Sequence, residues 1–173
     1  MKTERTIYLA RHAKSSWSTN ASDFERPLSK RGFSDAEKVG KEMDRLAWHP
    51  EKIISSPALR ASQTCQAYCD AIGFTHSNVE WKKDFYAAYT ITLLHAITGL
   101  NENIQSVMLV GHNPSMEDLL IHLCCQSELS EIRQSNGKLF TTSNIMKLTF
   151  DGRWKDLMAS EAELNAVLRP KNL

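Results

Sequence analysis

The sequence predicts an α/β fold, a three-layer sandwich whose central sheet is mostly parallel and carries an antiparallel hairpin at one edge. Short apolar runs that suit buried strands alternate with longer segments of helical periodicity, which is typical of a parallel sheet covered by helices. The 173 residues are 42% hydrophobic, enough for one domain with one core. Because no repeat, low-complexity tract or Pro/Gly-rich linker interrupts the chain, we expect residues 1–173 to form a single domain.

The first strand and the first helix are predicted from an apolar run and a capping residue. Residues 6–10 form the apolar run, and the helix is expected near 29–47 with Ser29 as its N-cap. One face of this helix is apolar at helical spacing and should pack on the sheet. The residues of that face are Ala36, Val39, Met43 and Leu46.

A second strand near 51–55 leads into a helix near 57–72. Ser56 is a natural N-cap, and Pro57 suits the first helical position because its missing N–H would have no partner there. This assignment puts Arg60 about one turn into the helix, near an end where free N–H groups and the helix dipole favour anions.

The second half of the chain continues the alternation. Helices are expected near 90–99 and 114–125, on either side of a strand near 106–111. The polar stretch 127–140 is interpreted as a loop over one side of a ligand site.

The last strand, expected near 144–150, should belong to a terminal hairpin. Asp151-Gly152 is a turn signal between the apolar runs 145–150 and 154–158. The two strands of a hairpin are antiparallel, so this pair would give the otherwise parallel sheet its antiparallel edge.

Cationic and imidazole side chains stand at three predicted strand ends. Arg11 and His12 follow the first strand, Arg60 comes after the second, and His112 follows the strand near 106–111. If these strands are neighbours in one parallel sheet, the four side chains converge, because ligands bind beyond the carboxyl ends of such strands. Two guanidinium groups and two imidazoles suit a phosphoryl group, which arginine can grip with two parallel hydrogen bonds.

Five segments give the chain a resemblance to a known family, in the family's order and between about residues 6 and 159. The chain resembles the histidine phosphatase superfamily, with its phosphoglycerate mutase-like fold, and more narrowly the small SixA-type phosphohistidine phosphatases. The superfamily's hallmark is Arg-His-Gly, whereas this chain has Ala13 in place of the glycine, which gives up some freedom to adopt positive φ. The matching segments are Arg11-His12-Ala13-Lys14-Ser15, Asp23-Phe24-Glu25-Arg26-Pro27-Leu28-Ser29, Ser55-Ser56-Pro57-Ala58-Leu59-Arg60-Ala61, Val110-Gly111-His112-Asn113-Pro114 and Phe140-Thr141-Thr142-Ser143.

The resemblance implies a mechanism and a role for each of the four residues. His12 would be the nucleophile and would carry the phosphoryl group as a covalent intermediate. Arg11 and Arg60 would neutralise the phosphoryl oxygens, and His112 would donate a hydrogen bond to the same group. We expect no metal and no cofactor, because the arginines supply positive charge.

The general acid is the least defined part of this expectation. Larger members of the superfamily place a Glu or Asp after the third strand, and Asp84 is the near candidate here. The alternative is that Asp84 is an ordinary solvated loop charge. SixA-type members lack a clear acid, which fits an imidazole leaving group, because imidazole can be protonated before the P–N bond breaks.

Three further residues are candidates for substrate binding: Arg26, Ser18 and Ser55. Arg26 would reach the phosphate, or else anchor its loop through a salt bridge. Ser18 would line the pocket, or else simply form a turn. Ser55 would orient the phosphate end of the second helix, and Trp17 would cover the pocket or pack against a neighbour.

Charge and targeting signals limit the partners. The net charge is +1, so a nucleic acid is not an expected partner. No signal-like segment and no apolar stretch of about 20 residues is present, so we expect a cytoplasmic protein without a membrane span. The expected partner is a phosphorylated protein or a small phosphorylated metabolite, and the chain is expected to be a monomer.

The four cysteines are expected to be packed free thiols. A zinc site that combines His122 with Cys124 or Cys125 has poor ligand spacing. No cysteine is followed by arginine six residues later, and no Gly-x-x-x-x-Gly-Lys segment occurs, so the sequence lacks a thiol-phosphatase loop and a P-loop.

The leading functional hypothesis is a metal-independent phosphatase that acts on protein phosphohistidine. One alternative is a phosphatase of small phosphate esters of the sugar or nucleotide type, or a related phosphomutase. Another is a non-catalytic module that binds phosphoproteins. A burst of phosphoenzyme would separate the binding module from the enzymes.

Overall fold

The computed structural model describes residues 3–173, and these form one six-stranded mixed sheet with helices on both faces. The strand order is β3-β2-β4-β1-β5-β6. The strands are β1 (Glu4–Arg11), β2 (Lys52–Ser55), β3 (Glu80–Trp81), β4 (Ser106–Gly111), β5 (Ile145–Asp151) and β6 (Glu163–Leu168). The helices are α1 (Lys30–Arg45), α2 (Leu59–Ile72), α3 (Thr90–Thr98), α4 (Ser115–Leu123) and α5 (Gln126–Ile132), with short 3-10 helices η1 (His76–Asn78), η2 (Lys83–Phe85), η3 (Trp154–Asp156) and η4 (Pro170–Asn172).

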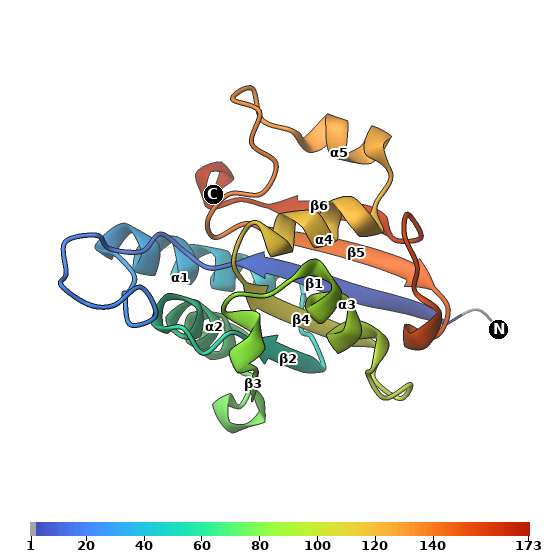
Figure 1. The fold of residues 1–173 in the computed structure, drawn as a ribbon, viewed down its shortest axis with the longest axis horizontal. Coiled ribbons are helices and arrows are strands. Elements are labelled where there is room, and N and C mark those ends of the chain that lie inside the picture. The colour runs from blue at the N-terminus through green and yellow to red at the C-terminus, as the bar shows by residue number, and fades with distance from the viewer. Residues whose placement is uncertain (1–2) are drawn as a thin grey trace.

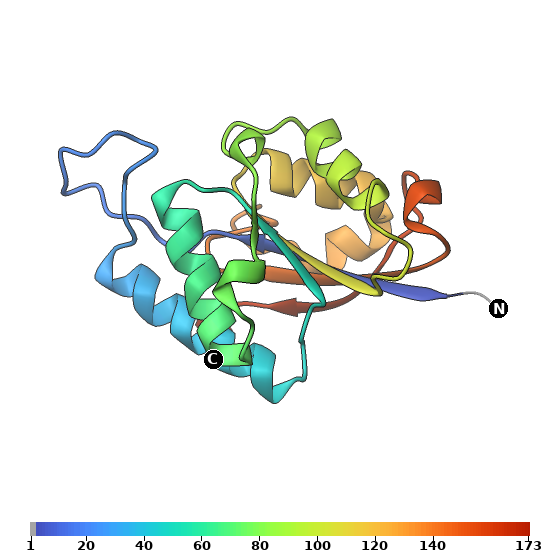
Figure 2. The same ribbon diagram turned by 90° about the horizontal axis from the view of Figure 1, so that it is seen from below.

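The helices form two layers around the sheet. Figure 2 shows α1 and α2 on one face, with α3 and α4 on the opposite face. In Figure 1 the loop that follows β1 (blue) projects beyond the end of the sheet toward which β1 points. The predicted three-layer α/β architecture is therefore confirmed.

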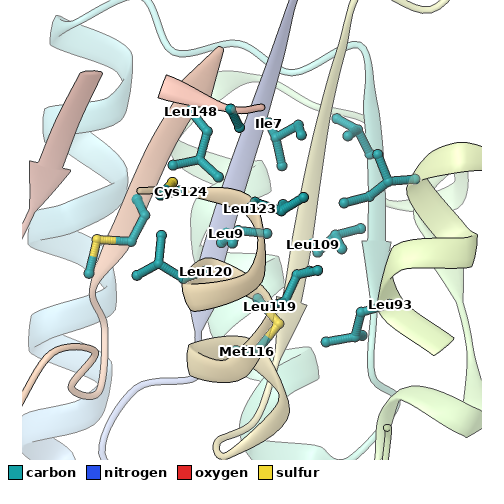
Figure 3. Close-up of a cluster of buried hydrophobic side chains, with 14 of the residues drawn as sticks. Ile7, Leu9, Leu93, Leu109, Met116, Leu119, Leu120, Leu123, Cys124 and Leu148 are labelled. Carbon is teal, nitrogen blue, oxygen red and sulfur yellow. The ribbon is translucent and has the colours of Figure 1, made fainter. Parts of the chain in front are cut away.

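Alternating side chains of β1 enter two separate cores. Ile7 and Leu9 are fully buried on the face covered by α3 and α4, and Figure 3 shows part of this cluster around α4. Tyr8 and Ala10 point to the face covered by α1 and α2. Each fully buried Leu or Ile contributes about 1.5–3 kcal/mol, so both cores hold β1 at the centre of the sheet.

The register of the sheet brings three strand ends to one edge. β1 lies between β4, which is parallel to it, and β5, which is antiparallel. Arg11 pairs with Gly111, and Ser55 at the end of β2 pairs with Val110 of β4. The carboxyl ends of β2, β4 and β1 are thus adjacent, as the convergence of their polar residues requires.

The predicted start of α1 is confirmed, and the predicted start of α2 is wrong. The Ser29 hydroxyl accepts a hydrogen bond from the N–H of Gly32 at 3.0 Å, which caps α1. In contrast, α2 begins at Leu59, after Pro57, because Ser56 is still held at the sheet: its N–H donates to the carbonyl of Val110 at 3.0 Å. Leu46, assigned to the apolar face of α1, lies beyond the helix and is exposed.

The antiparallel edge is present, but its outer strand is not the predicted one. β5 pairs with β6, whereas the segment expected to form the hairpin begins with the 3-10 helix η3. The cause is Trp154, which is fully buried and donates from its indole nitrogen to the carbonyl of Ile104 at 2.8 Å. Burial of this large side chain takes residues 154–156 away from the edge of β5.

The stretch 127–140 is only partly a loop. Its first residues belong to α5, which the sequence analysis did not predict, and the fully buried Leu129 fixes this helix to the core. The N–H of Cys125 donates to Glu128 at 3.1 Å in a capping box that starts the helix. Residues 133–140 form the remaining loop beside the carboxyl end of β1.

Free thiols lie in both cores. Cys65, Cys69 and Cys124 are buried and Cys125 is partly buried, as expected for packed residues without a disulfide. Within residues 3–173, no helix combines the length and the apolar character that crossing a bilayer requires.

Candidate active site

The four strand-end residues line one cavity of about 280 Å³. Arg11 ends β1, His12 follows it, His112 follows β4, and Arg60 is the second residue of α2. The structure therefore brings these four residues together, as the sequence-based expectation of convergence requires. The full lining is Arg11, His12, Lys14, Ser15, Trp17, Arg26, Arg60, His112, Asn113 and Thr142.

The main chain of His12 is fixed by hydrogen bonds to β4 and to the segment just before β5. Its N–H donates to the carbonyl of Gly111 at 3.0 Å, and its carbonyl accepts from the N–H of Ser143 at 3.2 Å. The next residue, Ala13, is fully buried and donates to the Thr64 hydroxyl at 2.9 Å. Because Ala13 is not among the residues with positive φ, alanine fits this position without backbone strain.

The imidazole of His12 is neutral and has a defined tautomer. Its Nδ1 lies 2.7 Å from the carbonyl oxygen of Ala13, which can only accept, so Nδ1 carries the proton and Nε2 carries a lone pair. Burial, together with the positive charges of Arg60, Arg11 and Arg26, lowers the pKa of His12 to about 4. A neutral imidazole with a free Nε2 is the nucleophilic form of histidine.

The second imidazole, His112, lies opposite the first. The centroids of the two rings are 5.1 Å apart, and Nε2 of His112 is hydrogen-bonded to the Ser56 hydroxyl at 2.8 Å. Burial, together with His12 and Arg60, lowers the pKa of His112 to about 3. Nδ1 of His112 is buried and has no hydrogen-bond partner among residues 3–173, which leaves it for a ligand.

Two of the arginines are held by the same carboxylate, that of Asp23. Arg26 donates to Oδ1 at 2.8 Å, and Arg60 donates to Oδ2 at 3.1 Å and to the main-chain carbonyl of Asp23 at 2.6 Å. Tyr86 also donates to Oδ2, at 2.6 Å. The hydrogen bonds from Tyr86 and Arg26 hold the pKa of Asp23 well below its usual range, so this residue is a fixed anion and not a proton donor.

Arg11 is held by the loop that precedes β5. Its guanidinium donates to the carbonyl of Phe140 at 2.9 Å. Burial lowers its pKa, and the nearby carboxylate of Glu117 opposes that effect. Arginine keeps its charge in either case, so Arg11 presents a cation to the cavity.

The other predicted site residues are placed very differently. Arg26 lines the cavity and also forms the salt bridge to Asp23, so both interpretations of it are compatible with its position. Ser18 is exposed and hydrogen-bonded to Ser16 at 2.9 Å, away from the cavity lining. Ser55 is fully buried, and its hydroxyl donates to the carbonyl of Ser56.

Asp84, the candidate general acid, is exposed in η2 and is not part of the lining of this cavity. Trp17, in contrast, lies at the cavity. Its ring stacks on the guanidinium of Arg26, whose Cζ lies 3.8 Å from the ring centroid, although 76% of Trp17 is exposed.

Sequence reasoning missed the residues that hold the site together. Asp23 and Tyr86 are 63 positions apart, and no local sequence pattern predicts their pairing. The spacing of Asp23 and Arg26, three residues apart, is the one signal that could have suggested an ion pair. Ser56 was assigned to helix capping, whereas it orients His112.

The charges around this cavity favour an anion. Its lining, within the part of the chain that the structure describes, has four cationic side chains and no carboxylate: the cations are Arg11, Lys14, Arg26 and Arg60. Among residues 3–173, no group of three or more His, Cys, Asp or Glu side chains is arranged to hold a metal ion. Chemically, the cavity combines a nucleophilic imidazole with donors for phosphoryl oxygens.

Comparisons with known proteins agree with this chemistry. The sequence model described as "Histidine phosphatase superfamily (branch 1)" matches residues 7–85. An uncharacterized chloroplastic protein of Arabidopsis thaliana is 31% identical over 166 residues, which cover 90% of this chain and 71% of the relative. The phosphohistidine phosphatase SixA of Escherichia coli is 27% identical over 149 residues, with 84% and 85% covered.

A solved structure is similar over nearly its whole length. The crystal structure of the putative phosphohistidine phosphatase SixA from Agrobacterium tumefaciens superposes with a TM-score of 0.83 at 32% sequence identity. The similarity covers 96% of this chain and 98% of that one.

Proposed function

Because the chain belongs to the histidine phosphatase superfamily and is a phosphatase, we propose that it removes phosphoryl groups from phosphohistidine in proteins, with His12 as nucleophile. The observation that carries this proposal is the state of the His12 ring. It is neutral, its Nδ1–H is bound to Ala13, and its Nε2 belongs to a cavity lined by cations. That combination supports nucleophilic attack on a phosphoryl group at neutral pH.

In the first step, Nε2 of His12 attacks phosphorus, and the bond from phosphorus to the leaving nitrogen breaks. The electron pair of the broken bond returns to the leaving group, and the phosphoryl group becomes bound to His12. Arg11, Arg26 and Arg60 neutralise the negative charge on the phosphoryl oxygens. This matters because catalysis of phosphoryl transfer depends mostly on positioning and electrostatics.

In the second step, water attacks the phosphorus of the phosphoenzyme. His12 leaves as a neutral imidazole that keeps its Nδ1 proton, and phosphate is released. His112 offers its unpartnered Nδ1 to a phosphoryl oxygen, while Ser56 orients the ring from the other side. This role requires the tautomer in which Nδ1 carries the proton and the Ser56 hydroxyl donates to Nε2.

Two observations support phosphohistidine as the substrate. First, two similar proteins carry the name SixA: the phosphohistidine phosphatase of Escherichia coli, at 27% identity, and the putative phosphohistidine phosphatase of Agrobacterium tumefaciens, at 32%. The cavity, among the residues described, offers no carboxyl group as a proton donor, and Asp84 lies outside it. An imidazole leaving group needs no such donor, because it departs neutral once its other nitrogen is protonated.

The test is a rapid-mixing experiment with a protein phosphorylated on histidine, in the presence of a chelator. The wild type should show a burst of acid-labile, alkali-stable phosphoenzyme followed by steady phosphate release. His12→Ala should give neither, with an unchanged circular dichroism spectrum. His76→Ala is a matched control, because His76 is a surface residue paired with Asp70.

Three results would contradict the proposal. Steady hydrolysis by His12→Ala would remove the assigned nucleophile. Release of phosphate from aryl or sugar phosphates, but not from phosphohistidine, would make the protein an esterase of small phosphates. Binding of the phosphoprotein without any burst would make it a binding module.

A further inference from the structure

A second cavity, of about 540 Å³, adjoins the cavity that holds His12. The two share four lining residues, Arg11, Lys14, Asn113 and Thr142, so a molecule bound by its phosphoryl group in one can extend into the other. The rest of the second lining comes from the start of α4 and from the loop before β5. Those residues are Glu117, Asn136, Gly137, Lys138, Phe140 and Thr141.

Glu117 is fixed in the wall of this second cavity. Its Oε2 accepts hydrogen bonds from the N–H of Phe140 at 3.0 Å and from the side-chain amide of Asn113 at 3.3 Å. Asn113 also donates to the carbonyl of Phe140 at 2.9 Å, the same oxygen that holds Arg11. The network ties the carboxylate to a guanidinium that lines both cavities.

Only one oxygen of Glu117 is used in this way. Within the described part of the chain, both of these hydrogen bonds end on Oε2, which leaves Oε1 for a ligand. Among the residues described, Glu117 is also the only carboxylate in the lining of either cavity. A rigidly held carboxylate oxygen beside a cationic site favours a ligand that brings a hydrogen-bond donor on its departing side.

We propose that the second cavity receives the imidazole leaving group, and that Oε1 of Glu117 accepts a hydrogen bond from its non-phosphorylated nitrogen. This inference rests on the proposed function, namely that phosphohistidine is the substrate. A carboxylate beside an imidazole favours the protonated ring, because an opposite charge stabilises the charged form.

The protonated ring carries the proton that the leaving group needs in the first step. The P–N bond of the substrate breaks, its electron pair returns to the ring nitrogen, and phosphorus bonds to Nε2 of His12. The other ring nitrogen keeps the proton that Glu117 holds in place. The leaving group is then a neutral imidazole, and no separate proton donor is required.

The same geometry discriminates against alcohol leaving groups. An alkoxide or phenoxide has no second nitrogen that could donate to Oε1, and its developing negative charge would be repelled by Glu117. Glu117 is therefore a residue that determines specificity for the P–N substrate.

The test compares Glu117→Gln with the wild type on two substrates, a protein phosphorylated on histidine and p-nitrophenyl phosphate. Removing the charge should lower kcat/KM for phosphohistidine by about tenfold or more, the size of a lost charged hydrogen bond. Hydrolysis of the aryl phosphate should not fall and should rise modestly, because this substrate makes no such bond and Glu117 no longer repels its phenoxide. Asp118→Asn is the matched control, since the neighbouring Asp118 is exposed and lines neither cavity.

A pH profile adds a readout that a structural role would not move. On phosphohistidine, the alkaline decline of the rate should begin at a lower pH in Glu117→Gln, because the substrate ring loses its proton more easily. Equal losses on both substrates would overturn the inference and give Glu117 a structural role at Phe140 and Asn113. An unchanged rate on phosphohistidine would also overturn it. If the wild type cleaves only the aryl phosphate, the proposed function itself fails.

Discussion

The cavity that holds His12 has two walls that are built in different ways. The strand-end wall consists of Arg11, His12 and His112, and main-chain hydrogen bonds between strands fix its position. The loop wall consists of Ser15, Trp17 and Arg26 in the loop after β1, and side-chain contacts fix its tip.

The difference separates two functions of the site. The strand-end wall carries the proposed nucleophile, whose position depends on backbone register and therefore on the whole sheet. The loop wall carries one cation, Arg26, whose position depends on the carboxylate of Asp23, and the same carboxylate holds Arg60 of α2. We expect changes in the strand-end wall to affect the chemical step, and changes in the loop wall to affect mainly binding.

Arg60 gives the largest expected effect, because it lines the cavity and also anchors the loop wall through Asp23. Arg60→Ala should lower kcat/KM by about a thousandfold, the size of other losses of a phosphoryl-binding arginine. Steady-state kinetics with phosphohistidine would measure this, and Arg60→Lys should recover only part of the loss. A fall in kcat/KM of less than about tenfold would show that Arg60 is needed neither to bind the phosphoryl group nor to anchor the loop wall.

Asp23→Asn is a sharper test of the loop wall. The charge that holds Arg26 and Arg60 would be removed, and we expect kcat/KM to fall by about ten- to a hundredfold, mostly through KM. Glu25→Gln is a suitable control, because Glu25 is exposed in the same loop and, within residues 3–173, its hydrogen bonds are to Ser22. If kcat fell while KM stayed constant, Asp23 would support the chemical step instead.

The pH dependence tests the strand-end wall. Burial lowers the pKa of His12 to about 4, so the free enzyme should keep its nucleophile neutral well below pH 6. The acidic limb of kcat/KM should therefore fall near pH 4, whereas an unperturbed histidine would already have lost about thirtyfold at pH 5. An acidic limb near pH 6.5 would contradict the buried, neutral ring.

The same shift makes folding stability depend on pH. The unfolded chain takes up protons on His12 and His112 below about pH 6.5, whereas the folded pKa values are about 4 and about 3. Protons therefore favour the unfolded state in this interval, and the free energy of unfolding should fall as the pH drops from 6.5 toward 4. In urea titrations, replacing His112 by Gln should flatten this slope.

Trp17→Ala should have the smallest effect. Its ring stacks on Arg26 but is mostly exposed, so KM should rise by about two- to threefold with kcat unchanged. Trp17→Phe should keep most of the affinity. A large fall in kcat would show that Trp17 closes over the reacting group.

The strand-end wall could be predicted from the sequence because its signals are local. Apolar runs that end in Arg11-His12 and in His112 show where the strands stop, and parallel strands bring their ends together. In the loop wall, Arg26 and Trp17 could be named as candidates, but their geometry could not be predicted, because it depends on pairs such as Asp23 with Tyr86. No periodic pattern connects residues so far apart.

Two other errors also have physical causes. The Asp151-Gly152 turn signal was local, but burial of Trp154 outweighs it and removes the next residues from the sheet. Helix α5 was missed because it is polar apart from a few residues, and Leu129 is its only buried side chain among those described.

The anchoring of His12 has a consequence for how such a protein can be modified. Both main-chain groups of His12 are bonded to Gly111 and Ser143, and the loop is closed at its base by the N–H of Ser16, which donates to Pro27 at 2.8 Å. Residues 17–22, between these points, are all exposed. A segment of different sequence or length can replace them without displacing the nucleophile. Substrate range can therefore diverge by loop exchange, during evolution or in the laboratory, while the reaction chemistry is inherited intact.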